Sequence, residues 1–414
     1  MTHSDTAPLV SFCIPTFNRC RYLASLLESL VVQLADFPFP HELVIADNAS
    51  TDATAETIAA FAGRLPIRAL RHASNIGGYG NWQFVQAQAA GRYVVYVADD
   101  DSILGDQLAS AVARMEADPG LAVVYAPWLL YDLVAQQSQG QFFTVPNDLR
   151  IERNEHVQLL DHVLRHHIFP EIQIVRRDVL QATMPRVNEH AFFAFVHAAD
   201  YLTQGAILIQ REPFYVSITR YFADEVREQL GMSEVEHAWD RYRGGLEYMI
   251  ARTGATVSAE ERFGLHARIQ HMIAARMAVA IRLRHANRRD PIDTYHLAMR
   301  LRGLGHESLL SVPLATLASE AMVAFVMRDG ELHRGVRQMI CIGTSDRAER
   351  DYFKREARVP VEFVADMERC AHLSDALLFV RDDAVQAQLL DRVAAAAKNV
   401  RIVRERDVAA RFGL

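Results

Sequence analysis

The chain has 414 residues, of which 50% are hydrophobic and 23% charged, so two or three globular domains with large cores are expected. A formal net charge of −7 argues against a dedicated nucleic-acid-binding protein. No run of about 18 apolar residues predicts a membrane-spanning helix. The start shows no signal-peptide pattern, and the four cysteines lack metal-binding or C-x-x-C spacing. We therefore expect a cytoplasmic chain with reduced thiols.

Short apolar strands alternate with helical patterns over the first hundred residues. Strands are predicted at 10–14, 42–46, 67–71 and from Val94 onward, and a further single strand is predicted over 121–131. Helices are predicted after the first three, with an apolar stripe from Leu23 to Leu34 in the first of them. The glycine-rich stretch 75–81 is predicted to be a loop, followed by a helix over 82–90. Short connections of this kind predict a parallel, right-handed α/β sheet.

Three adjacent carboxylates, Asp99, Asp100 and Asp101, follow the strand that begins at Val94. Their mutual repulsion must be offset, and a divalent cation is the usual means. On an extended chain Asp99 and Asp101 point the same way, so both could reach one Mn²⁺ or Mg²⁺ ion that in turn holds phosphate oxygens. The alternative is a solvated loop that caps the helix starting near Asp106.

Polar residues also follow the first two strands, at Pro15–Thr16 and Asp47–Asn48. In a parallel sheet these positions and the three aspartates lie along one edge, where α/β proteins bind ligands. An acid for a base or ribose and a metal for a diphosphate would suit a nucleotide. The chain lacks a G-x-G-x-x-G or G-x-x-x-x-G-K-[ST] motif at this edge, which excludes the ordinary dinucleotide and P-loop interpretations.

The order and spacing of four motifs resemble family 2 glycosyltransferases, strongly over about the first third of the chain. These are the segment 15–19 (Pro-Thr-Phe-Asn-Arg), the segment 44–52 (Val-Ile-Ala-Asp-Asn-Ala-Ser-Thr-Asp), Asn-x-Gly at Asn75, and the three aspartates. The family has the GT-A fold, a Rossmann-like and mostly parallel α/β sheet. It transfers a sugar from a nucleotide donor with inversion.

The resemblance implies roles for individual residues. Asp47 would accept a hydrogen bond from the donor base, and Asp101 would ligate the metal together with Asp99. The other residues expected at the donor are Pro15, Thr16, Asn18, Arg71, Asn75, Asp100 and Arg220. Arg220 suits a clamp on the diphosphate, although an ordinary surface arginine explains it as well. Asp52 is expected to cap a helix.

An inverting transfer also needs a base beside the acceptor hydroxyl. The best match is Glu189, or its neighbour His190, at the start of a helix predicted to run to about Thr203. The alternative for this pair is a helix-dipole partner and a surface histidine. Glu171 and Asp200 are weaker candidates.

The chain changes character after about residue 223. Residues 224–334 are predicted to be helical, with arginines from Arg268 to Arg289 on a helix that could touch a membrane surface or simply pack. Residues 335–414 predict a small Rossmann-like α/β domain with a packing or oligomerisation role, although Gly343-Thr344-Ser345 could hold an anion. The expected domains are therefore 1–223 (donor half 9–131, acceptor half 132–223), 224–334 and 335–414.

The function predicted from these features is a metal-dependent inverting glycosyltransferase with a nucleotide-diphosphate sugar donor, of which UDP is the commonest in the family. The acceptor would be a glycan, a lipid-linked glycan or a protein, in keeping with bacterial surface-glycan synthesis. Two alternatives are a sugar-phosphate nucleotidyltransferase and a non-catalytic nucleotide-binding scaffold. The segment 15–19 lacks the glycines that the first would need.

Overall fold

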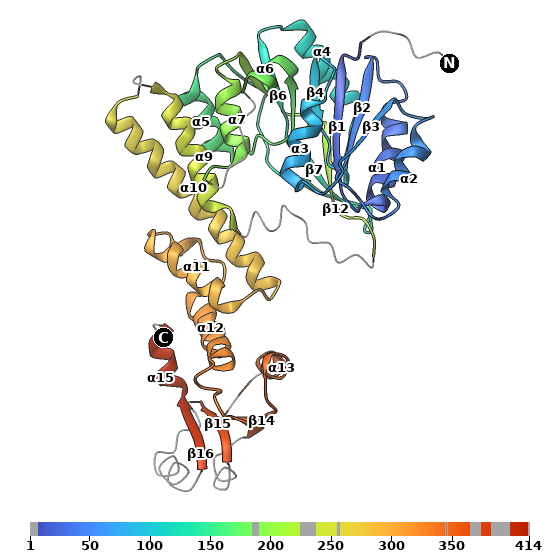
Figure 1. The fold of residues 1–414 in the computed structure, drawn as a ribbon. Helices are drawn as coiled ribbons and strands as arrows, with labels where there is room; N and C mark the ends of the chain where they lie inside the picture. Colours follow the sequence, from blue (N-terminus) through green and yellow to red (C-terminus); the bar gives the residue numbers. More distant parts are fainter. Residues whose placement is uncertain are drawn as a thin grey trace. The chain divides into compact units, whose positions relative to one another are not determined.

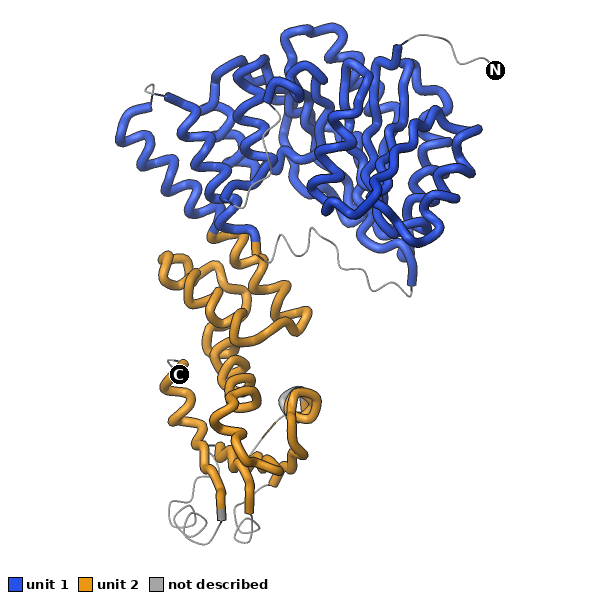
Figure 2. Tube along the Cα trace, in the orientation of Figure 1, with its two compact units in different colours: residues 1–230, 238–273 blue, residues 231–237, 274–414 orange. Residues whose placement is uncertain are grey.

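The structure is a computed structural model that describes residues 7–183, 190–223, 237–254, 257–343, 345, 347–364, 374–381 and 398–412. The chain divides into two compact units, coloured separately in Figure 2. Unit 1 comprises residues 1–230 and 238–273, and unit 2 comprises residues 231–237 and 274–414. The expected division into three domains stays a prediction.

An eight-stranded sheet forms the centre of unit 1, in the order β3-β2-β1-β4-β10-β6-β11-β9. Figure 1 labels its strands β1, β2, β3, β4 and β6. The first four strands along the chain are parallel, namely β1 (Val10–Thr16), β2 (His41–Asp47), β3 (Ile67–Arg71) and β4 (Tyr93–Tyr96). The antiparallel strand β10 (Gln173–Arg176) joins β4 to β6 (Leu121–Tyr125). The sheet ends with β11 (Ala206–Ile209), parallel to β6, and the antiparallel edge strand β9 (Leu149–Ile151). The predicted mostly parallel α/β sheet is thus confirmed.

Helices follow the strands of unit 1 as the apolar spacing predicts. Leu23, Leu26, Leu27 and Leu30 of α1 are all fully buried, so this helix covers the sheet with its leucine stripe. The helices assigned wholly to unit 1 are α1 (Cys20–Gln33), α2 (Thr54–Phe61), α3 (Gly78–Ala87), α4 (Gly105–Ala117), α5 (His156–His166), α6 (Arg177–Thr183), α7 (Phe193–Tyr201) and α9 (Trp239–Arg252). The long helix α10 (Ala259–Ala286) contributes residues to both units.

A second, four-stranded sheet in unit 1 has the order β5-β12-β7-β8. Its strands are β5 (Asp101–Ile103), β12 (Tyr215–Arg220), β7 (Trp128–Asp132) and β8 (Gln137–Gln141). Two predictions about the secondary structure of unit 1 are wrong. The single strand predicted over 121–131 is two strands, β6 and β7, in different sheets. The glycine-rich loop predicted over 75–81 already contains the first turn of α3, which begins at Gly78 directly after Gly77 with its φ of +83°.

Unit 2 combines a helical part with the predicted small α/β fold. Its further helices are α11 (Pro291–Gly303), α12 (Leu314–Arg328), α13 (Arg347–Glu356) and α15 (Glu405–Ala409), with short 3₁₀ turns at Glu307–Leu309 and Ala410–Phe412. A parallel sheet has the order β14-β13-β15-β16, formed by β14 (Val361–Val364), β13 (Gln338–Ile342), β15 (Ser374–Val380) and β16 (Lys398–Arg404). Met322 and Val326 of α12 pack with Met339 and Phe379 of this sheet in one core.

The arginines of α10 are partly used for packing. Arg268 Nη1 lies 2.8 Å from Asp161 Oδ1 on α5. Arg284 is 5% exposed and its Nε donates to Thr294 Oγ1 at 3.2 Å. Within the described parts of the chain, we find no helix that is both long and apolar enough to cross a bilayer. Membrane contact through α10 stays a prediction.

Candidate functional site

The carboxyl ends of β1, β2 and β3 carry the polar residues that the sequence singled out. Strand register places Thr16 of β1 beside Asp47 of β2, and Asp47 beside Arg71 of β3. The backbone N–H of Asn48 donates to the Thr16 carbonyl at 2.9 Å, which ties the two strand ends together. The expected clustering at one edge of the sheet is therefore what the register produces.

Asp47 is a buried carboxylate, and one of its two oxygens accepts a hydrogen bond. It is 2% exposed, and its Oδ1 accepts from the Ser50 N–H at 2.9 Å. Among the described residues, no group hydrogen-bonds to Oδ2, although Arg71 Nε lies 3.5 Å away as an ion-pair partner. The buried hydroxyl of Thr16 likewise has no hydrogen-bond partner in this part of the structure. Buried polar groups without a hydrogen bond cost free energy. The Asp47 carboxylate and the Thr16 hydroxyl therefore suit a ligand with an N–H group for the first and an oxygen atom for the second.

Three asparagines fix the segment between β3 and α3 to the strand ends. Asn48 donates to Asn75 Oδ1 at 2.9 Å and accepts from the Ile76 N–H at 2.9 Å. Asn75 Oδ1 also accepts from the Gly77 N–H at 2.8 Å. Asn81 of α3 is 2% exposed and donates to the Ala46 carbonyl at 2.8 Å. Asn75 is thus a support of this segment, which forms a wall beside Asp47.

Replacing Asn81 by alanine is expected to destabilise unit 1 by about 1–3 kcal/mol, because the Ala46 carbonyl would be left buried without this donor. Denaturant unfolding followed by tryptophan fluorescence measures this directly, since Trp82, Trp128 and Trp239 all belong to unit 1. The exposed Asn147 provides the control, and its alanine variant should stay within about 0.5 kcal/mol of wild type. Equal stabilities for the two variants would contradict this role for Asn81.

Asn18 and Asp52 hold neighbouring loops together. Asn18 has a left-handed backbone (φ +52°), and its Oδ1 accepts from the Thr51 N–H at 2.7 Å. Asp52 accepts from the Cys20 N–H at 3.0 Å and from the Thr54 N–H at 3.1 Å, at the starts of α1 and α2. The Asn18 side chain therefore holds the loop that follows β2 in place. Asp52 caps helix ends in the way the sequence suggests.

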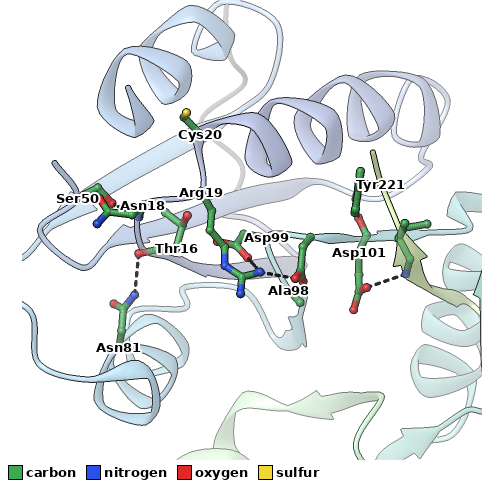
Figure 3. A network of polar contacts seen from close by, with 12 residues as sticks. Thr16, Asn18, Arg19, Cys20, Ser50, Asn81, Ala98, Asp99, Asp101 and Tyr221 are labelled. Carbon is green, nitrogen blue, oxygen red and sulfur yellow. Dashed lines mark hydrogen bonds and ion pairs between the residues drawn. The ribbon is translucent and has the colours of Figure 1, made fainter. Parts of the chain in front are cut away.

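The carboxylates of Asp99 and Asp101 point in different directions, and that of Asp99 points toward Arg19 (Figure 3). The chain turns at Asp99 and Asp100, so the alternation expected of an extended strand does not occur. Arg19 Nη1 donates to Asp100 Oδ2 and lies 3.7 Å from Asp99 Oδ1. Asp101 opens β5, and its carboxylate points to β12, away from Arg19. The sequence did not single out Arg19 as a partner, although it lies in the segment 15–19 and carries the charge that three aspartates require.

Asp101 is held by strand β12. Its Oδ2 accepts from the Tyr215 hydroxyl at 2.9 Å, and its Oδ1 accepts from the Ile218 N–H at 2.9 Å. Burial and the nearby charge of Asp100 raise the pKa of Asp101 to about 7, against the opposite effect of the hydrogen bonds from Ile218, Tyr215 and Ser217. Burial lowers the pKa of Arg19, but Asp99 and Asp100 outweigh it and leave that pKa raised.

A divalent cation needs hard oxygen donors that can leave their present partners. Asp99 and Asp100 fit this need, because both face the guanidinium of Arg19, whose positive charge a cation could replace. Asp101 fits poorly, because both of its oxygens already accept hydrogen bonds from β12. Across the described ranges, no group of three or more His, Cys, Asp or Glu side chains is arranged as a metal site. The carboxyl edge of the large sheet thus offers Asp99 and Asp100, but not Asp101, as ligands to a divalent cation.

The candidate base residues belong to the sequence just before α7, whose Phe193 ring centre lies 5.3 Å from that of Trp82 on α3. Glu189 is outside the described residues. His190 is exposed and precedes α7, which begins at Phe193, whereas the predicted helix opened within the segment 187–191. Helix α9 packs closely on this segment, since the Phe192 N–H donates to the Arg241 carbonyl at 2.7 Å. A Cβ placed on Gly244 of α9 would lie 2.0 Å from the His190 carbonyl oxygen, so only glycine permits this contact.

The remaining candidates have structural partners. Arg220 Nε lies 3.5 Å from Asp132 Oδ1 at the end of β7. Asp200 of α7 accepts from the Tyr248 hydroxyl at 2.8 Å, so it joins α7 to α9. Glu171 lies in the turn before β10. A hollow at the opposite, amino-terminal edge of the large sheet is lined by the ion pairs Arg92–Glu116 and Arg176–Asp178 and includes none of the predicted site residues.

A mostly parallel sheet with a polar carboxyl edge defines a ligand-binding α/β domain. The sequence of residues 11–183 matches the model of the family described as glycosyl transferase family 2. The predicted resemblance to this family is thereby confirmed.

Two named relatives are glycosyltransferases. The chain is 40% identical over 103 residues to abequosyltransferase RfbV of Salmonella typhimurium, covering 24% of this chain and 31% of the relative. It is 35% identical over 108 residues to poly(ribitol-phosphate) beta-N-acetylglucosaminyltransferase TarS of Staphylococcus aureus, covering 26% and 18%. A crystal structure of residues 1–349 of that TarS with UDP-GlcNAc aligns over 77% of this chain and 86% of its own, at 16% identity and a TM-score of 0.47. The chain spans less than half the length of the curated relatives it matches.

Proposed function

We propose that unit 1 transfers a sugar, with inversion, from a nucleotide-diphosphate donor to a hydroxyl group of a glycan, lipid-linked or protein acceptor. The observation that carries this proposal is the buried Asp47 carboxylate at the carboxyl edge of the sheet, because no described residue hydrogen-bonds to its Oδ2. An N–H of a pyrimidine base would donate the hydrogen bond to Asp47 Oδ2, and the Thr16 hydroxyl would bond to the same ligand. The match of residues 11–183 to the family model supports the reaction class.

The diphosphate of the donor would lie near Asp99 and Asp100. A divalent cation, Mn²⁺ or Mg²⁺, would be held there by these two carboxylates and would supply positive charge to the phosphate oxygens. Asp101, expected from the resemblance to be a ligand, would instead hold β5 on β12. Arg19 would leave Asp100 when the cation binds and remain beside the site.

The transfer itself follows from the chemistry of inversion. The acceptor hydroxyl oxygen attacks the anomeric carbon, the bond from that carbon to the diphosphate oxygen breaks, and the nucleoside diphosphate leaves with the electron pair. The hydroxyl proton passes to a base on the segment before α7, for which Glu189 and His190 remain the candidates. The contact of α9 with the His190 backbone would fix the position of this segment.

The donor nucleotide and the acceptor are proposed from the family resemblance and from the names of the relatives. UDP is proposed as the donor nucleotide because family 2 enzymes use it most often. The names of RfbV and TarS, an abequosyltransferase and a transferase to poly(ribitol-phosphate), favour an acceptor that belongs to a bacterial surface glycan.

The reaction is tested by incubating the full chain with Mn²⁺ and a panel of nucleotide sugars, and by analysing the products. Release of a nucleoside diphosphate, through hydrolysis or transfer to added glycans, is the expected result. A nucleotidyltransferase would instead form pyrophosphate from a nucleoside triphosphate and a sugar phosphate. Failure to release any nucleoside diphosphate from any donor would contradict the proposal.

Asp99→Asn is expected to lower the affinity for Mn²⁺ by at least about tenfold, since an amide is a weaker ligand than a carboxylate. The Mn²⁺ concentration that gives half-maximal donor turnover measures this change. Asp101→Asn is the matched comparison, and we expect it to leave the Mn²⁺ requirement within about twofold of wild type while lowering stability by about 1–3 kcal/mol. The reverse ranking of the two variants would assign the metal to Asp101.

A further inference from the structure

Unit 2 contains a cavity of about 340 Å³ that has no part in the proposed transfer. Its walls come from the end of α10, from α11 and α12, from α13, and from the residue that follows β15. The volume lies within the range of small-molecule binding sites. All of its lining residues belong to unit 2.

Arginines from three different elements converge on this cavity. Arg288 and Arg289 follow α10, Arg355 belongs to α13, and Arg381 follows β15. The carboxylate among the described lining residues is Glu320, and its Oε2 lies 3.1 Å from His285 Nδ1. The lining therefore carries an excess of positive charge. The dipole of α10 favours basic residues near its own carboxyl end, but it does not account for Arg355 and Arg381.

Two of these arginines also pair with acids. Arg355 Nε lies 3.0 Å from Glu356 Oε1, and Arg381 Nε lies 3.3 Å from Glu405 Oε1. A guanidinium presents five N–H donors. An arginine can therefore contact a carboxylate and a phosphate oxygen through different N–H groups.

Tyr352 supplies an independent sign of a ligand. It lines the cavity, and the Arg355 guanidinium lies 5.3 Å from the centre of its ring. The Tyr352 hydroxyl is buried, and no described residue hydrogen-bonds to it. A buried hydroxyl without a partner is unfavourable by about 1–3 kcal/mol. An oxygen atom of a bound molecule would remove that cost.

The topology of the small sheet places Arg381 where α/β proteins bind ligands. In the order β14-β13-β15-β16, the chain leaves β13 toward β14 on one side and later returns to β15 on the other. The switch point is therefore between β13 and β15. The Arg381 N–H donates to the Ile342 carbonyl at 2.9 Å, which fixes Arg381 at the carboxyl end of both strands. Crevices at such points are the usual ligand sites of open parallel sheets.

We propose that this cavity binds a small phosphate ester, as a second anion site separate from the donor site of unit 1. Guanidinium groups pair with phosphate oxygens in a bidentate manner. Tyr352 and the hydroxyls of Thr316 and Ser319 suit the ester oxygen and a hydroxylated group such as a sugar. The ligand could be a sugar phosphate or a nucleotide, since both carry this chemistry. The site does not depend on the reaction proposed for unit 1.

The test is calorimetric titration of the full chain with pyrophosphate, glucose 1-phosphate and UMP, in EDTA so that binding through a divalent metal is suppressed. We expect one binding site per chain for at least one probe. Arg355→Ala should weaken it by about 10- to 150-fold, and Tyr352→Phe by about 3- to 10-fold. A preference for glucose 1-phosphate would identify a sugar phosphate, and a preference for UMP a nucleotide.

Arg347→Ala is the matched control, because Arg347 lies on the same helix with a side chain that is 96% exposed. It should leave the affinity unchanged. Arg288→Ala provides a second cavity variant at an exposed position, in case Arg355→Ala loses its fold by circular dichroism. Absence of binding by all three probes would overturn the proposal. So would equal losses for Arg347→Ala and the cavity variants, which would indicate diffuse charge attraction.

Discussion

Replacing Asp47 by asparagine is expected to lower kcat/KM for the nucleotide-sugar donor by about 10- to 150-fold, the range for loss of a hydrogen bond to a charged group. Oδ2 is the buried oxygen beside Arg71 that the proposed base would use. The amide of asparagine can keep the bond from Ser50 with its oxygen, but it then presents a donor to the base. Steady-state kinetics with varied donor concentration measures the effect.

Asp52→Asn is the control for this variant, because Asp52 belongs to the same loop and serves the starts of α1 and α2. It should lower stability while leaving the KM for the donor near the wild-type value. If Asp47→Asn turned over the donor as well as wild type, the base would not bind at Asp47.

Replacing Gly244 by alanine is expected to remove most of the transferase activity while nucleotide binding persists. The new methyl group would lie 2.0 Å from the His190 carbonyl oxygen, which is backbone, so the segment that carries Glu189 and His190 must move. A displacement of about 1 Å in a catalytic group can cost on the order of a hundredfold in rate. Transfer rate and nucleotide affinity are measured on the same preparation.

Gly264→Ala is the matched control, because Gly264 lies in α10 with nothing within 4 Å of an added Cβ. It should keep full activity and gain up to about 1 kcal/mol of stability from the better helix propensity of alanine. Full activity in Gly244→Ala would show that the segment before α7 takes no part in the reaction. Parallel loss of nucleotide binding would point to general unfolding of unit 1.

The sequence predicted the edge of the sheet well because the end of each apolar strand can be located from the local sequence. Once β1, β2 and β3 are parallel and in order, Thr16, Asp47 and Arg71 must lie side by side. Each of the three strands could be recognised from a short apolar run. The same reasoning located the small parallel sheet of unit 2.

Long-range pairing is where sequence reasoning failed. The residues of the segment 121–131 do not indicate that its two halves, β6 and β7, join different sheets, because both halves are apolar. The direction of Asp101 depends on β12, more than a hundred residues away, and the direction of Asp100 depends on Arg19. A charge argument could have found Arg19, because three adjacent carboxylates need a cation. No sequence signal could have paired Gly244 with His190.

The most direct test of the account is calorimetric titration of the wild-type chain with UDP, GDP, CDP and dTDP, with and without Mn²⁺. We expect one of these nucleotides to bind at one Mn²⁺-dependent site per chain, and Asp47→Asn and Asp99→Asn each to weaken that binding. If no nucleoside diphosphate shows Mn²⁺-dependent binding, the carboxyl edge of the large sheet is not a donor site and the proposed transfer is contradicted.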